Sequence, residues 1–166
     1  IESGLVSGWS HPFSGLDHLL AMVAVGLWAA QLGQRAFWSV PLTFVSVMLL
    51  GGCLGMAGIT LPYLETGIML SILFLGLLIA RSARFPLPIC LGLVALFALF
   101  HGFAHGLEIP PNASGAAYTL GFIAATATLH LMGMGLGLMT GAFLKGNMLR
   151  WAGASIAMAG VLLWLF

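Results

Sequence analysis

Charged side chains are so rare in this chain that their scarcity limits what it can fold into more than any other feature. They make up 5% of the sequence, and hydrophobic residues make up 61%. A soluble domain usually carries about 25% charged residues. The chain therefore has too few charges to cover a water-facing surface, whereas a lipid-facing surface suits apolar side chains. The composition predicts an integral membrane protein whose partner is the lipid bilayer, and the scattered basic residues give no sign of nucleic-acid binding.

Six apolar stretches divide the chain, and polar residues, proline or glycine separate them. A bilayer core of about 30 Å requires about 20 apolar residues in a helix, and only the third stretch is short for this. The sequence therefore predicts an all-α polytopic membrane protein, with one domain over 1–166 built as a bundle of six transmembrane helices. The expected helices are 15–33, 37–59, 66–80, 87–106, 115–144 and 149–166.

The basic residues all fall on one side of this map, between the first and second, third and fourth, and fifth and sixth helices. They are Arg35, Arg81, Arg84, Lys145 and Arg150. The other side holds Glu2, Glu65 and Glu108. Because basic loops stay in the cytoplasm, both termini are expected in the periplasm and the protein in a bacterial inner membrane. An outside N-terminus before an inward-running helix is typical of a mature chain whose signal peptide has been cleaved.

Most of the remaining ionisable residues gather in two short clusters, one where the first expected helix starts and one where the fourth ends. They are His11, Asp17 and His18 in the first cluster, and His101, His105 and Glu108 in the second. The distribution of Lys and Arg places both clusters at the same, non-cytoplasmic face. Far apart in sequence, the two clusters are therefore expected to meet in space.

Helical geometry indicates which of these side chains share a face. At about 100° per residue, His101, His105 and Glu108 lie at about 0°, 40° and −20°, in one narrow stripe. Asp17 and His18 point about 100° apart, so only one of them is expected to face the same centre. The other is expected to hydrogen-bond a neighbouring histidine and fix its tautomer.

Imidazole and carboxylate ligands together suit nickel, cobalt, zinc, copper and iron. The clusters therefore predict a site for a divalent transition metal ion. His130 is expected on the fifth helix, about 20 Å below the outer surface at 1.5 Å per residue. At that depth it is a candidate ligand along a permeation path, although a hydrogen bond between helices explains it equally well. Packing is the simpler interpretation of the methionines that follow it, Met132, Met134 and Met139.

The sequence resembles the HupE/UreJ family of small membrane proteins, through two signatures. The signature HPxxGxDH is matched by His11, Pro12, Gly15, Asp17 and His18, and FHGxxHGxE by Phe100, His101, Gly102, His105, Gly106 and Glu108. The resemblance covers essentially the whole chain. It implies a nickel or cobalt permease linked to hydrogenase or urease maturation, with six helices after a cleaved leader, and motif residues that transport requires.

The expected function is secondary transport of a divalent metal ion, Ni²⁺ first and Co²⁺ or Zn²⁺ next, from the periplasm for metalloenzyme maturation. The sequence contains no Walker motif, so the driving force is expected to be the membrane potential or an ion gradient, and no enzymatic activity is expected. Two alternatives remain: an intramembrane zinc-dependent hydrolase that uses Ser14, and an accessory protein that binds metal without transporting it. A homo-oligomer is compatible with the sequence.

Overall fold

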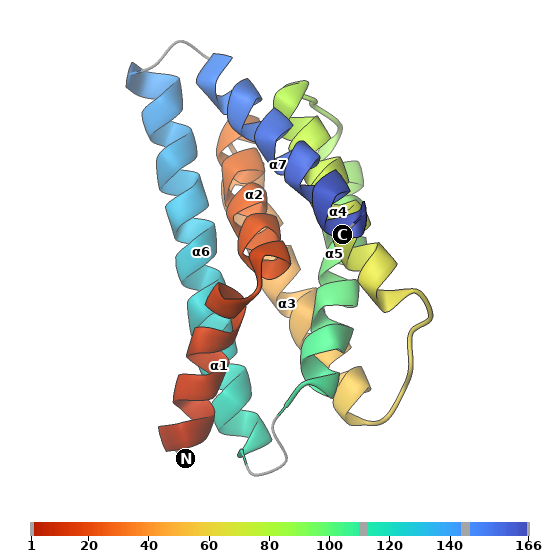
Figure 1. Cartoon of the computed structure of the whole chain (residues 1–166). Coiled ribbons are helices and arrows are strands. Elements are labelled where there is room, and N and C mark those ends of the chain that lie inside the picture. Colours follow the sequence, from red (N-terminus) through yellow and green to blue (C-terminus); the bar gives the residue numbers. More distant parts are fainter. Residues whose placement is uncertain (1, 110–112, 144–146, 166) are drawn as a thin grey trace.

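The described part of the computed structural model, residues 2–109, 113–143 and 147–165, is all-helical and contains seven α-helices (Figure 1). This confirms the predicted all-α class. The helices are α1 (Glu2–Ser14), α2 (Leu16–Leu32), α3 (Ala36–Met56), α4 (Leu64–Ala80), α5 (Leu87–Leu107), α6 (Gly115–Phe143) and α7 (Asn147–Leu165).

The main difference from the sequence-based expectation is at the start of the chain. The first helix was expected to begin at Gly15, but α1 precedes it and meets α2 at an angle of 83°. Pro12 lies in the last turn of α1 and lacks the N–H that would continue the helix ladder. Gly15 follows in an extended conformation with φ −109° and ψ 121°. The first polar cluster therefore spans two helices and the corner between them, instead of the mouth of one helix.

Four helices are long and apolar enough to cross a membrane: α3, α5, α6 over Gly115–Thr140, and α7. The bent pair α1 and α2 counts as a fifth candidate span. The 17 residues of α4 are apolar but fall short of the length required. The described helices thus support a multi-pass membrane protein, and the six-span count stays a prediction.

Close backbone contacts hold α1 and α2 against the long helix α6, which runs beside both (Figure 1). A Cβ atom on Gly26 of α2 would collide with the carbonyl oxygen of His130, and one on Gly8 of α1 with that of Tyr118. Small residues at such crossings let transmembrane helices approach closely. Because α6 contacts both halves of the bent pair, it fixes the corner that carries the first polar cluster.

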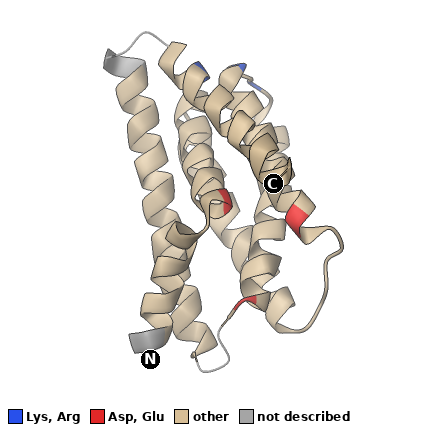
Figure 2. Ribbon diagram, viewed as in Figure 1, with Lys and Arg blue, Asp and Glu red and all other residues tan. Residues whose placement is uncertain are grey.

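The arginines lie at one end of the bundle, and the acidic residues lie between its middle and the other end (Figure 2). Arg35 caps the start of α3 and Arg81 the end of α4, and Arg150 of α7 donates through Nε to the carbonyl oxygen of Ala80 at 3.0 Å. Lys145 lies outside the described residues, as does the side chain of Glu2. This is the separation on which the predicted orientation depends, and the orientation itself stays a prediction.

Candidate metal centre

Three helices bring the predicted ligands together. His11 comes from the last turn of α1, His18 from the first turn of α2, and His101 and His105 from the final turns of α5. Glu108 follows directly after α5 as its C-cap residue. The corner between α1 and α2 therefore faces the end of α5, and residues far apart in sequence form two overlapping groups.

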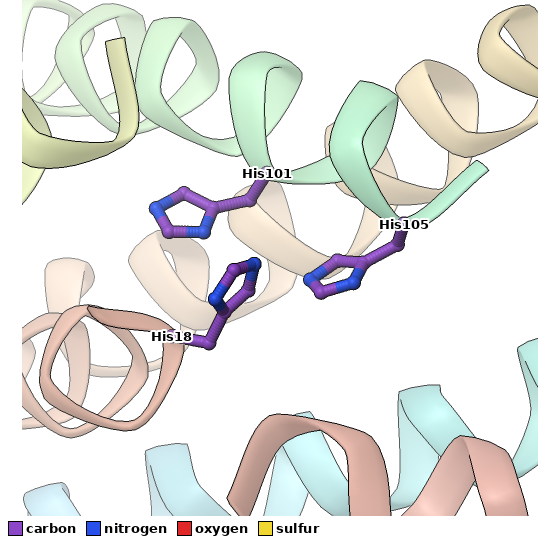
Figure 3. Close-up of side chains that lie close together, drawn as sticks. All are labelled: His18, His101 and His105. Carbon is purple, nitrogen blue, oxygen red and sulfur yellow. The ribbon is translucent and has the colours of Figure 1, made fainter. Parts of the chain in front are cut away.

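The first group, here called the inner triad, consists of His18, His101 and His105. One ligand atom of each lies within 4.8 Å of the other two. The ring centroid of His18 is 4.4 Å from that of His105 and 5.2 Å from that of His101. The three rings face a common point (Figure 3), and all three side chains are buried. At this spacing, a single metal ion could bind all three side chains at once.

The second group, the outer triad, consists of His11, His105 and Glu108, with ligand atoms again within 4.8 Å of one another. Oε2 of Glu108 lies 3.0 Å from Nε2 of His11 and 3.6 Å from Nδ1 of His105. The imidazoles of His105 and His11 hold the pKa of the Glu108 carboxyl well below its usual range. The outer triad thus adds a negative charge, and its Glu108 side chain is 45% exposed.

Asp17 belongs to neither triad and contacts His18 instead. Its Oδ1 lies 2.8 Å from Nδ1 of His18. A carboxylate only accepts hydrogen bonds, so Nδ1 of His18 carries the hydrogen and Nε2 keeps its lone pair. A Cβ atom on Gly15 would lie 2.6 Å from Oδ1 of Asp17, so the glycine at the corner leaves room for this contact. Of the adjacent pair, His18 faces the centre and Asp17 orients it.

All three histidines of the inner triad have buried ring nitrogens with no hydrogen-bond partner. These nitrogens are Nε2 of His18, Nδ1 of His101, and both ring nitrogens of His105. Leaving a buried polar atom unsatisfied costs about 1–3 kcal/mol. A neutral imidazole offers one lone pair. A metal ion that accepts one lone pair from each of the three histidines would remove much of that cost, so the residues present fit a transition metal ion.

His130 lies outside both triads. It is 2% exposed, and its ring centroid is 5.1 Å from that of Phe44. The ring centroid of Phe44 in turn lies 5.7 Å from that of His101, so this one phenyl ring is a neighbour of both imidazoles. Both ring nitrogens of His130 lack a partner. The structure therefore keeps His130 as a separate buried polar group and does not bring it to the cluster.

Several side chains that contact the site could not be predicted from the sequence. The hydroxyl of Ser71 on α4 lies 3.0 Å from Nε2 of His101. The ring of Phe122 on α6 lies 3.8 Å from that of His105, centroid to centroid, and the ring of Tyr118 lies 5.9 Å from that of His11. The only sign of Ser71 in the sequence was a single serine in an apolar stretch. Nothing in the sequence pointed to the two aromatic residues.

No solved structure matches this chain. The family model described as HupE / UreJ protein matches residues 1–163. Protein HupE of Rhizobium leguminosarum bv. viciae is 48% identical over 160 residues, which cover 96% of this chain and 84% of that protein. The chain therefore belongs to the HupE/UreJ family, whose members are membrane proteins associated with nickel and cobalt transport for hydrogenase and urease.

Proposed function

We propose that this protein is a permease that carries a divalent transition metal ion, Ni²⁺ in the first place, from the periplasm across the bacterial inner membrane for metalloenzyme maturation. The observation that carries the proposal is the set of four histidines and one carboxylate whose ligand atoms form two overlapping groups. Such ligands suit nickel, cobalt and zinc. In this proposal both termini are periplasmic and six segments span the bilayer.

The two triads supply two successive stations. The ion meets the outer triad first, because His11 and Glu108 are partly exposed and the carboxylate attracts a dication. It then moves to the inner triad, where three buried imidazoles replace its remaining water. His105 belongs to both groups. Its Nδ1 faces Glu108, and its other ring nitrogen points toward His18 (Figure 3), so one imidazole serves both stations.

Beyond the inner triad, the path proposed here leads past Phe44 to His130. This histidine is buried on α6 with two unpartnered nitrogens, and the Phe44 ring is a neighbour of both it and His101. An ionisable side chain buried in a membrane protein is a candidate for the substrate path by default. In this proposal His130 is a third contact for the ion.

The membrane potential is sufficient to drive inward flux of a dication. An inside-negative potential favours its entry by about 4.6 kcal/mol per 100 mV, from about 2.3 kcal/mol per elementary charge. Purified protein in liposomes loaded with a nickel-sensitive dye is therefore expected to admit Ni²⁺, and faster when a potassium gradient with valinomycin makes the interior negative.

Liposomes containing a variant with both His101→Ala and His105→Ala are the control for this experiment, and they are expected to match empty liposomes. Wild-type liposomes that bind nickel yet admit none would refute the permease and favour the accessory metal-binding protein. In the hydrolase alternative, Ser14 would help the histidines to hold zinc and an activated water. The Ser14 hydroxyl donates to the carbonyl oxygen of His11 at 2.6 Å. Tightly retained zinc with hydrolytic turnover in the same preparation would favour this alternative over the permease.

A further inference from the structure

Ser71 contacts the inner triad from a helix that carries none of the motif residues. Its side chain on α4 is fully buried, and its Oγ lies 3.0 Å from Nε2 of His101. The same Oγ lies 2.6 Å from the carbonyl oxygen of Ile68, to which it donates. A hydroxyl has one hydrogen, and a carbonyl oxygen can only accept. The hydrogen of Ser71 is committed to Ile68, so Ser71 must accept a hydrogen bond from His101.

This contact determines which nitrogen of His101 is free. If Nε2–H donates to Ser71, then Nδ1 of the neutral imidazole carries the lone pair. Nδ1 is buried and has no hydrogen-bond partner. In Figure 3 one nitrogen of the His101 ring is turned toward His18 and the other away from it. The free lone pair thus faces the centre of the inner triad.

Asp17 makes the corresponding contact on the opposite side of the triad. It accepts from Nδ1 of His18 at 2.8 Å, which leaves Nε2 of His18 free, buried and unpartnered. In His105, Nδ1 is the atom near Glu108, so Nε2 is the one left for the inner triad. Three neutral nitrogen lone pairs therefore converge without a carboxylate among them.

We propose that Ser71 is a positioning residue that fixes His101 as the Nε2–H tautomer, so that the inner triad binds metal through Nδ1 of His101 and Nε2 of His18 and His105. The statement that the inner triad binds metal rests on the proposed function, whereas the statement about the tautomer of His101 does not. Without the Ser71 oxygen, the Nε2 proton has no acceptor in a fully buried position, and moving it to Nδ1 blocks the lone pair. A donor set of three neutral imidazoles selects Ni²⁺, Co²⁺ or Zn²⁺ over Mg²⁺ and Ca²⁺, which prefer oxygen ligands.

Nuclear magnetic resonance of metal-free protein, purified in detergent and labelled with ¹⁵N-histidine, tests the tautomer directly. The signals of His101 are identified by their loss in His101→Gln. The wild type is expected to show a protonated Nε2 and an unprotonated Nδ1 at His101. Ser71→Ala is expected to move the proton to Nδ1 in a substantial fraction of molecules, and Ser71→Thr, which keeps the hydroxyl, to restore the wild-type pattern.

Nickel titration of the same preparations tests the consequence for binding. Ser71→Ala is expected to lower the affinity for Ni²⁺ by about 10–100-fold, as is typical when the hydrogen-bond partner of a metal ligand is removed. Ser39→Ala is the matched control. The Ser39 hydroxyl bonds only the carbonyl oxygen of Arg35, at 2.8 Å, so this variant should bind Ni²⁺ with the affinity of the wild type.

A wild-type His101 protonated on Nδ1 would overturn the proposal even if neither Ser71 variant folds. So would a Ser71→Ala variant that keeps the wild-type tautomer, whatever its nickel affinity. Absence of flux in liposomes, together with the expected tautomer and affinities, would instead refute the permease and leave the role of Ser71 intact. The two failures are therefore distinguishable.

Discussion

Replacement of His105 by alanine is expected to reduce nickel uptake by intact cells to the level of cells that lack the protein. His105 is the one residue that both triads contain, so its loss leaves two ligands in each. The ring is also held in place, since Phe122 packs against it at 3.8 Å between centroids. Uptake of radioactive nickel, normalised to the amount of protein in the membrane, measures the effect.

Leu96→Ala on the same helix is the control for this experiment. The Leu96 side chain is 51% exposed and lies outside both triads, so its truncation should leave uptake unchanged. Uptake by His105→Ala cells at the wild-type rate would contradict the proposed path. Loss of uptake in Leu96→Ala as well would show that the assay responds to damage anywhere on α5 instead of to the loss of a ligand.

Gly102→Ala is expected to lower the thermal stability of the purified protein and to weaken nickel binding, although it adds only one methyl group. Gly102 lies next to His101 on α5 and faces α3, where an added Cβ atom would collide with the carbonyl oxygen of Met48. In the same way, a Cβ atom added to Gly106 would collide with the carbonyl oxygen of Gly52. Backbone atoms cannot move aside as side chains do, so the helices must separate. Overpacking of this kind costs about 1–3 kcal/mol.

Gly92→Ala separates this packing effect from helix propensity. Gly92 lies on the same helix with no atom within 4 Å of an added Cβ, so alanine there should be neutral or stabilise the helix by up to about 1 kcal/mol. Thermal unfolding followed by circular dichroism in detergent, with nickel titration of the folded protein, compares the two variants. Equal melting temperatures would show that α3 and α5 do not approach each other as closely as described.

The alternation of histidine and glycine at the end of α5 explains why the second motif was the easier one to interpret. Helical geometry alone places His101 and His105 on one face and Gly102 and Gly106 on another. The structure uses the first face for the triads and the second for contact with α3. Because a shared face depends only on a regular helix, the sequence was enough to predict that of the two histidines. The contact of the glycine face with α3 was not predicted.

The first motif was harder, because it does not lie on a regular helix. The sequence suggested one helix from Gly15 onward, whereas the chain turns by 83° between α1 and α2. The stretch before Gly15 contains serines, glycines and a histidine, so its hydropathy does not distinguish a helix from a loop. Its helix depends on packing against α6, a contact between distant segments that no local pattern reports.

Contacts between distant helices account for the other residues that the sequence did not predict. A serine in an apolar helix commonly bonds its own backbone, and Ser71 does so through Ile68. Its second contact exists only because α4 lies beside α5 at the depth of His101. Phe44 is similar, since nothing in the α3 sequence indicates that its ring is a neighbour of both His101 and His130.

A diffraction experiment on nickel-soaked crystals, recorded on both sides of the nickel absorption edge, tests the central claim most directly. The account predicts an anomalous peak bound by ring nitrogens of His18, His101 and His105 at about 2 Å, the distance typical of imidazole bound to a comparable metal. A weaker second peak at His11 and Glu108 would mark the outer triad in a fraction of molecules. A peak bound by other residues, with all three inner imidazoles left without metal, would contradict the account.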